Sequence, residues 1–184
     1  MKVKVLMVQL IYKRIDELRK FWEKFLIVIE VLHIARGYKE YALLLGHGHY
    51  FLDIISKYPD FLRKVSPFLY GIAPMVESIL KMEDEKEKEE EFRKIIPLVQ
   101  EEVERLWNNI EDIIIDSYED ALYDATDSDE LVRAYRREVE ESIIPKLREL
   151  KDENKRERMK NLSFILATSI IHLFREIERI VMWR

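Results

Sequence analysis

The sequence contains no cysteine. A chain without cysteine forms no disulfide, offers no thiolate to a metal and has no cysteine nucleophile for catalysis. Disulfide-dependent folds belong to oxidising compartments, and no signal peptide is recognisable after Met1. The expected location is therefore the cytoplasm.

Glycine and proline are also scarce, with four and five residues among 184. Hydrophobic residues make up 48% of the chain and charged residues 36%, which is typical of helical bundles and of neither disordered nor β-rich proteins. A chain of this length buries roughly 70% of its unfolded surface. We expect an all-α fold: one domain over residues 1–184, built as a compact antiparallel bundle of about six helices.

Long hydrophobic runs are missing as well. The two most apolar runs, residues 25–35 and 162–174, are shorter than the roughly 20 residues that a helix needs to cross a membrane. We therefore expect no membrane span, and we expect the helices at 21–35 and 162–183 to be the most buried. Glutamine is rare while lysine, glutamate and isoleucine are abundant, a composition similar to that of hyperthermophile proteins.

Motifs that carry common enzyme chemistry are absent. The sequence has no glycine-rich phosphate loop, no Gly-x-Ser-x-Gly and no His-Glu-x-x-His. Metal-dependent catalysis is the main kind of catalysis that these absences leave open. The sequence favours a non-catalytic role. Basic clusters at 133–137 and 155–160 are dense enough to bind phosphates, but they adjoin acids in a chain of pI about 5.6. We interpret them as solvated helix faces, or as surfaces that an acidic segment meets within the fold or across a dimer, and we expect no nucleic-acid partner.

Two heptad seams predict the main helices. The first predicts a helix from about residue 3 to Arg36, with Gly37 as its C′ residue. The second begins at Phe92 and continues to Leu122 with a kink at Pro97, which makes it the longest expected helix. The seams consist of Val8, Ile11, Ile15, Leu18, Trp22, Phe25, Ile29 and Leu32, and of Phe92, Ile96, Val99, Val103, Leu106, Ile110 and Ile113.

Prolines and charges predict where the remaining helices begin and end. Pro59 is expected at the first position of a helix, and Pro67 and Pro74 are expected to divide or kink the following segment. Residues 83–91, EDEKEKEEE, contain no apolar side chain and must be solvated. They are the best candidate for a boundary between two halves, 1–82 and 92–184, each of about three helices.

The segment 111–129, EDIIIDSYEDALYDATDSD, holds eight carboxylates and no lysine or arginine. Residues 107–131 carry a charge of −9 while the whole chain carries −5, so the remainder carries +4. Four aspartates recur at every fourth position, and Asn108 and Glu104 extend the series toward the N-terminus. Each step of four turns the helix by about 40°, so neighbouring members share one face. The aspartates are Asp112, Asp116, Asp120 and Asp124.

Three interpretations of this ladder stay open. It could be the solvated side of an amphipathic helix, a site for a hard divalent metal ion such as Mg²⁺, Ca²⁺, Mn²⁺ or iron, or a docking face for a basic partner. Asp112-Ile-Ile-Ile-Asp116 and Asp120-Ala-Leu-Tyr-Asp124 resemble the E/D-x-x-x-D metal motifs of PhoU-type phosphate-uptake regulators. That resemblance implies two three-helix bundles with bound metal. In that family the motifs belong to separate repeats, whereas here they follow one another on one helix.

The histidines offer an alternative metal site. Glu30-Val-Leu-His33 has the Glu-x-x-His spacing of ferritin-like di-iron bundles, although the segment that ends at His172 reads Ser-Ile-Ile-His. A hydrogen bond between a buried histidine and a glutamate one turn away would explain His33 without metal. His47 and His49 flank Gly48 and could bind a transition metal on a turn.

The function expected from these patterns is a non-catalytic helical interaction or regulatory module that binds a protein partner or self-associates. The alternative is a metal-binding helical bundle, which would use either the ladder at 112–124 or a Glu/His site of ferritin-like type.

Overall fold

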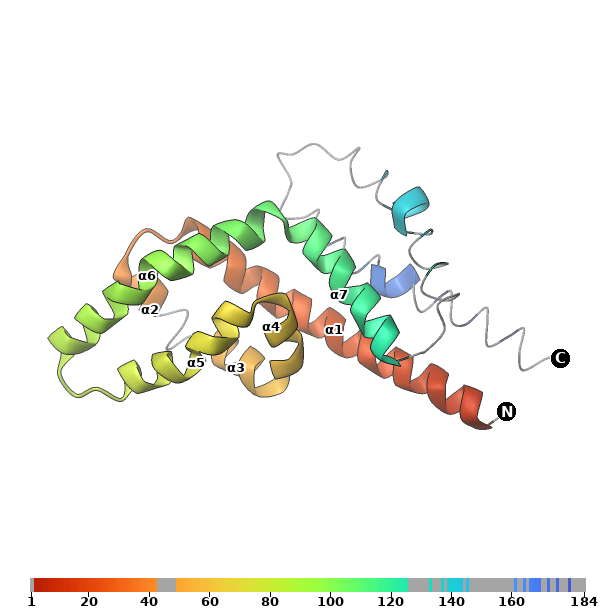
Figure 1. The fold of residues 1–184 in the computed structure, drawn as a ribbon, viewed down its shortest axis with the longest axis horizontal. Coiled ribbons are helices and arrows are strands. Elements are labelled where there is room, and N and C mark those ends of the chain that lie inside the picture. Colours follow the sequence, from red (N-terminus) through yellow and green to blue (C-terminus); the bar gives the residue numbers. More distant parts are fainter. Residues whose placement is uncertain are drawn as a thin grey trace. The chain divides into compact units, whose positions relative to one another are not determined.

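The computed structural model describes most of the first two thirds of the chain and separate residues beyond it. The described residues form helices α1 to α7, one short π-helix (Val139–Ile143) and further helical residues beyond α7, with no strand among them, so the predicted all-α class is confirmed (Figure 1). None of the described helices is both long enough and apolar enough to span a bilayer. The described residues are 2–42, 49–125, 133, 137, 139–143, 145, 161, 164, 166–169, 172, 175 and 179.

Helix α1 (Lys2–Ile34) is continuous over 33 residues and is the longest described helix. Its seam is buried as the heptad pattern predicts, with Ile11, Ile15, Leu18, Trp22, Phe25, Ile29 and Leu32 all at most 1% exposed. The prediction for its end is wrong, because Gly37 does not have a positive φ and the helix stops at Ile34. The backbone N–H of Ala35 donates to the Val31 carbonyl at 2.9 Å, and the N–H of Arg36 donates to the Glu40 carboxylate at 2.9 Å.

Four short helices follow: α2 (Tyr38–Ala42), α3 (His49–Lys57), α4 (Pro59–Val65) and α5 (Pro67–Leu80). Pro59 and Pro67 stand at helix starts, as predicted, because the missing N–H of proline costs nothing there. Ser66 is fully buried, and its hydroxyl oxygen accepts the N–H of Leu69 at 3.2 Å as the N-cap of α5. Pro74 lies inside α5 without ending it.

Helix α6 (Glu85–Asn108) begins at the N-cap Asp84, whose carboxylate accepts the N–H of Lys86 at 3.0 Å. The acidic residues 85–91 therefore form the first turns of a helix. Pro97 lies within α6. The prediction of one helix from Phe92 to Leu122 is wrong, because a turn at Asn109 separates α6 from α7 (Ile110–Ala125).

The turn between α6 and α7 is closed by a single side chain. The backbone N–H of Asn109 donates to the Arg105 carbonyl at 3.3 Å, and its side-chain amide donates to the same oxygen at 3.0 Å. In an uninterrupted helix the Arg105 carbonyl would accept one backbone N–H, whereas here it accepts two donors from Asn109. The N–H of Ile113 then donates to the Asn109 carbonyl at 3.0 Å, which starts α7.

The chain forms two compact units by contact density. The first contains Met1–Trp22 and Ile114–Arg184, and the second contains Glu23–Ile113. These units differ from the halves 1–82 and 92–184, and the acidic stretch 83–91 lies within the second unit. The division of one domain into halves 1–82 and 92–184 joined by residues 83–91 stays a prediction.

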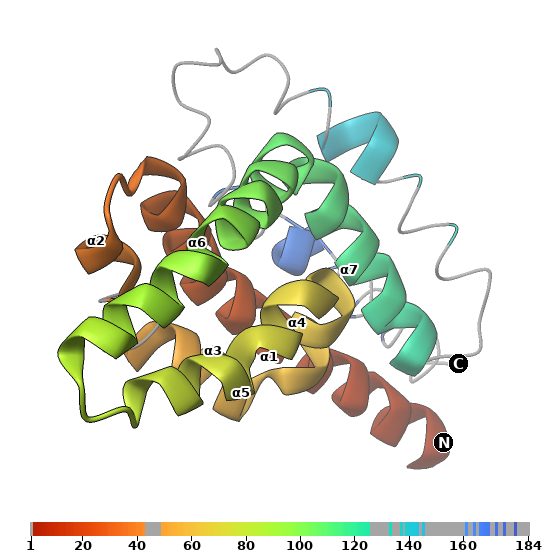
Figure 2. The same cartoon turned by 60° about the vertical axis from the view of Figure 1, so that its left-hand side comes forward.

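In the second unit, α5 and α6 form an antiparallel hairpin, α3 and α4 pack against α5, and α2 packs against α6 (Figure 2). The core of this unit includes the fully buried Phe51, Leu62, Leu69, Phe92 and Val99. A T-shaped contact between Tyr38 and Phe92, with ring centroids 5.7 Å apart, joins α2 to α6. The end of α1, α2 and α6 hold the residues of the pocket described below.

The first unit has a polar anchor in its core. The indole N–H of the fully buried Trp22 donates to the hydroxyl of Ser117 at 2.8 Å, and that hydroxyl donates to the Ile114 carbonyl at 2.6 Å. Tyr118 and Leu122 of α7 are also buried.

The burial prediction for residues 21–35 is confirmed by eight fully or almost fully buried side chains. In 162–183, Leu166 and Ala167 are buried, whereas Phe164 and His172 are exposed. Most other residues of that segment lie outside the described part of the chain.

Candidate functional site

The predicted acidic ladder lies along the outer side of α7. Asp112, Asp116 and Asp120 are exposed in successive turns, while Ile114 and Tyr118 between them are buried. Three carboxylates spaced by four residues therefore share one side of the helix, as the sequence predicts. We call Asp112, Asp116 and Asp120 the acidic face of α7. The side chain of Asp124 lies outside the described residues.

The preceding helix, α6, carries eight acids and five basic residues, and several of these form ion pairs with one another. On α6, Glu89 pairs with Arg93 and Glu91 pairs with Lys94, each at 2.7 Å, and Glu102 pairs with Arg105. These pairs follow the i,i+3 and i,i+4 spacings at which oppositely charged side chains meet on a helix. Helix α7 contains no lysine or arginine, so it cannot form such a pair within itself.

The predicted metal sites are not assembled among the described side chains. In that part of the chain, no group of three or more histidines, aspartates or glutamates is close enough to hold one ion. His47 lies outside the described residues, and His49 begins α3 with a side chain that is also outside them. A divalent metal ion bound by the ladder, or by Glu30, His33, His47 and His49, stays a prediction.

Asp53, the carboxylate next to this histidine pair in the sequence, is engaged elsewhere. It forms ion pairs with Lys24 of α1 and, at 3.2 Å, with Lys57 of α3. The hydrogen bond from Lys24, followed by that from Lys57, lowers the pKa of Asp53 below its ordinary value. Asp53 therefore ties α3 to α1 as a carboxylate.

His33, the histidine of the Glu-x-x-His motif, meets a glutamate of another helix. Its Nδ1 lies 3.2 Å from a carboxylate oxygen of Glu104 on α6. Its ring stacks on the indole of Trp107, with centroids 4.6 Å apart and planes 14° from parallel. The contact is an ion pair when the imidazole is protonated, and it joins the end of α1 to α6.

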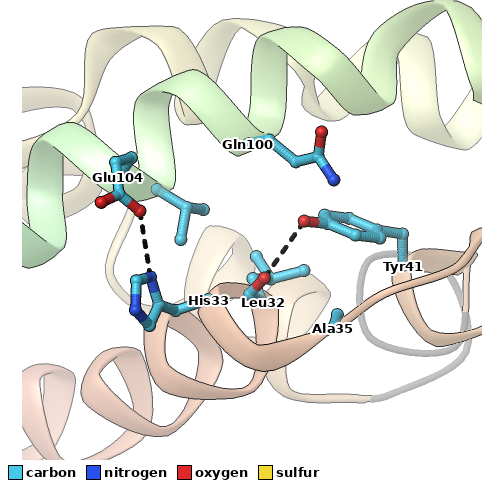
Figure 3. Close-up of a pocket in the computed structure, with 7 residues that line it drawn as sticks. Leu32, His33, Ala35, Tyr41, Gln100 and Glu104 are labelled. Carbon is cyan, nitrogen blue, oxygen red and sulfur yellow. Dashed lines mark hydrogen bonds and ion pairs between the residues drawn. The ribbon is translucent and has the colours of Figure 1, made fainter.

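A pocket of about 200 Å³ opens beside this pair, between the end of α1, α2 and α6 (Figure 3). Leu32, Ala35 and Val103 give it an apolar floor. Its polar walls come from His33, Tyr41, Gln100 and Glu104. The pocket lies entirely within the second unit.

Tyr41 closes one side of the pocket. The side chain is 2% exposed, and its hydroxyl donates to the Leu32 carbonyl at 3.1 Å. Burial raises the pKa of Tyr41, with a smaller opposing effect from a hydrogen bond with Gln100. The hydroxyl consequently keeps its proton and remains a donor to the end of α1. Figure 3 shows Gln100 and Tyr41 at one end of the pocket and the His33–Glu104 pair at the other.

Sequence reasoning missed most of this pocket. Among the polar members it noted His33, in the Glu-x-x-His motif, and Glu104, as an extension of the acidic ladder, but it did not connect the two. The turn at Asn109 places Glu104 on a different helix from the acidic face. Gln100, Glu104 and Trp107 recur at i, i+4 and i+7 beside the buried seam of α6, and this spacing is the signal that could have grouped them.

Comparisons of the chain with protein-family models, with curated proteins and with solved structures found no match. The PhoU-like and ferritin-like spacings therefore rest on the quoted residues alone.

Proposed function

We propose that the protein is a non-catalytic helical interaction module that binds a basic surface of a partner protein through the acidic face of α7. The observation that carries this proposal is the exposure of Asp112, Asp116 and Asp120 on a helix without a lysine or arginine. The charge is also concentrated, since residues 107–131 contain nine carboxylates and no base.

Physical chemistry favours a cationic partner for such a face. Like charges at i,i+4 destabilise a helix by about 0.2–0.5 kcal/mol per pair, and a basic surface relieves this repulsion. Complementary charge also raises the rate of association and selects against acidic partners. Most of this effect fades at high salt, because exposed charges are screened within about 10 Å at 0.1 M ionic strength.

A charge-reversal experiment tests the proposal. The probes are a fluorescent lysine-rich peptide and a glutamate-rich peptide of the same length, and binding is followed by fluorescence anisotropy. We expect the protein to bind the lysine-rich peptide only. Asp116→Lys with Asp120→Lys should weaken that binding by about tenfold or more, which corresponds to 1.4 kcal/mol. The same variant should begin to bind the glutamate-rich peptide.

The matched control makes the same charge change on α6. Glu87→Lys with Glu101→Lys alters two exposed residues of that helix, and we expect it to leave most of the affinity intact. Equal weakening by both variants would contradict the proposal, because binding would then follow net charge.

Sedimentation of the unmodified protein distinguishes the source of the basic surface. Arg133 and Arg137 are exposed on this chain and could supply it from a second copy. If the unmodified protein is a dimer and Asp116→Lys with Asp120→Lys dissociates it, the basic surface belongs to a second copy of the chain. That result would contradict the proposal of a different partner protein.

A further inference from the structure

One exposed side of α5 carries no charge. Pro67, Gly71, Pro74 and Met75 are exposed on this helix, and half of the Met75 side chain is accessible. Residues 65–76 contain no charged residue, although charged residues make up 36% of the chain. Helical geometry places the four exposed residues within an arc of about 100°, so they share one side of α5. We call these four residues the uncharged face of α5.

Helix α6, the other member of the same hairpin, has a charged outer side that includes Glu90, Arg93 and Lys94. Single exposed apolar residues are common on protein surfaces, but several that adjoin one another mark interaction sites. Phe68 and Tyr70 border the uncharged face of α5 and are partly exposed. Methionine and aromatic side chains are enriched at interfaces between proteins. The uncharged face therefore has the composition of an interface.

Gly71 lies in the middle of the uncharged face. A Cβ atom added to Gly71 would meet nothing within 4 Å, and its φ is not positive. Neither packing nor backbone conformation within the described residues therefore requires glycine at this position. Glycine inside a helix costs about 1 kcal/mol relative to alanine. It does allow the backbone of another helix to approach closely, which gives this residue a use in an interface.

Charges of opposite sign lie beyond the two ends of the uncharged face. Arg63 and Lys64 are exposed in the last turn of α4, directly before α5. Glu77, the one charged residue of α5, is exposed beyond the other end. Residues 57–64 hold three bases and one acid, whereas residues 77–91 hold eight acids and three bases. A surface with this distribution complements itself when turned by 180°, because each basic end then meets an acidic end.

We propose that the uncharged face of α5 is a dimer interface, which packs against the same face of a second copy of the chain. The two α5 helices run antiparallel about a two-fold axis at Gly71. Residue 77 of each copy then lies opposite residue 65 of the other, which brings Glu77 near Lys64 of the second copy. Antiparallel helices also place opposite ends of their dipoles together. The acidic face of α7 lacks this self-complementarity, since it would meet itself with like charge.

The size of the face indicates a weak dimer. Helix α5 has 14 residues and is therefore about 21 Å long, at a rise of about 1.5 Å per residue. One side of a helix of this length buries less than the roughly 800 Å² per partner of a stable interface. We therefore expect a monomer at low protein concentration and a dimer at high concentration.

Sedimentation equilibrium of the full chain between about 5 μM and about 500 μM tests the proposal. The apparent molar mass of the unmodified protein should rise with concentration toward that of a dimer. Gly71→Glu and Gly71→Lys should each weaken the dimer by about tenfold or more, because like charges then meet at the axis. The added side chain has room in the monomer, and circular dichroism checks that both variants fold. A monomer at every concentration would overturn the proposal and leave the face to a different partner.

Mixing the two variants tests the two-fold arrangement. An equimolar mixture of Gly71→Glu and Gly71→Lys should form a dimer again, because opposite charges then meet at the axis. Leu98→Glu and Leu98→Lys are the matched controls, since Leu98 is an exposed apolar residue of α6, and they should leave the dimer intact. Failure of the mixture to form a dimer, or an equal loss in the Leu98 variants, would overturn the proposal.

The acidic face of α7 takes no part in this dimer. Asp116→Lys with Asp120→Lys should therefore leave dimerisation unchanged, and the Gly71 variants should leave binding of the lysine-rich peptide unchanged. The two proposals can thus fail independently. Dissociation of the dimer by the α7 variant to the same extent as by Gly71→Glu would overturn the assignment of the interface to α5.

Discussion

Helices α6 and α7 follow one another in the chain. Their buried sides are similar, but the charges on their exposed sides differ. Both bury an apolar seam, with Val99 and Leu106 on α6 and Ile114 and Leu122 on α7. Both carry acids on the outer side. On α6 these acids alternate with lysine and arginine, whereas on α7 they stand without any basic residue of the same helix.

The comparison shows that the buried side of a helix fixes its position, whereas the charges on its exposed side decide what it can bind. The inner seams give both helices their position through burial, which does not depend on charge. On α6, lysine and arginine at i,i+3 and i,i+4 offset part of the acidic charge of the helix. Helix α7 has no lysine or arginine of its own to do so, and we propose that a basic surface supplies the opposite charge.

The largest expected effect comes from substitutions in the buried apolar seams of α6 and α7. Leu106→Ala on α6 and Ile114→Ala on α7 should each lower the free energy of unfolding by about 2–5 kcal/mol, because both residues are fully buried. Leu98→Ala is the control, since Leu98 is 51% exposed and should cost within about 0.5 kcal/mol. Guanidinium unfolding measures all three. A cost for either buried residue as small as that of Leu98 would contradict the role of its apolar seam in stability.

The next prediction uses Asp53, a carboxylate of α3 that forms ion pairs with Lys24 and Lys57. Lys24 and Lys57 lower its pKa in the folded protein. Its contribution to stability is therefore present above the unfolded value of about 3.9 and is lost as the pH falls through that value toward the folded pKa. Unfolding curves between about pH 5 and pH 3 should show a smaller loss of stability for Asp53→Asn than for the unmodified protein. Identical pH profiles would show that the two lysines do not stabilise the folded carboxylate.

A smaller effect should have opposite signs on the two helices. Asp120→Asn on α7 removes a like charge four residues from Asp116 and should raise the free energy of unfolding by a few tenths of a kcal/mol. Glu89→Gln on α6 removes the partner of Arg93 and should lower it by about 0.3–0.5 kcal/mol. Urea unfolding at low salt resolves the signs. Changes of the same sign would contradict the distinction between the two outer faces.

The inside of these helices could be predicted from the sequence because burial follows the heptad spacing. Seven predicted positions of α1 are buried, and in the second seam Phe92, Val99, Val103, Leu106 and Ile110 are buried too. The acidic face of α7 was predictable for the same reason, since the step of four residues places Asp112, Asp116 and Asp120 on one side.

The helix ends were less predictable because they depend on single polar contacts. The apolar seam continues across Asn109, so nothing in the hydrophobic spacing marks the turn that its amide closes. The sequence suggested that the helix continues through Pro97 with a kink; α6 does continue through Pro97, and the kink stays a prediction. Gly37 suggested a left-handed end to α1, but the Glu40 carboxylate accepts the N–H of Arg36 just after the helix instead.

The pocket was the least predictable feature because it depends on which helices meet. The Glu-x-x-His motif suggested Glu30, one turn away on the same helix, as the partner of His33, but the glutamate that His33 meets is Glu104. Glu104 is 71 residues away from His33 in the sequence, and only the packing of the end of α1 with α6 brings the two together. No spacing within one helix carries that information.

The most direct test of the central claim is the salt dependence of binding to the lysine-rich peptide. The affinity of the unmodified protein should fall steeply as the salt concentration rises from about 0.05 M to 0.5 M, because exposed charges are then screened. Asp116→Asn with Asp120→Asn should bind more weakly at low salt and show a flatter dependence, while Glu87→Gln with Glu101→Gln should behave like the unmodified protein. The same slope and affinity for both variants would contradict a docking face on α7.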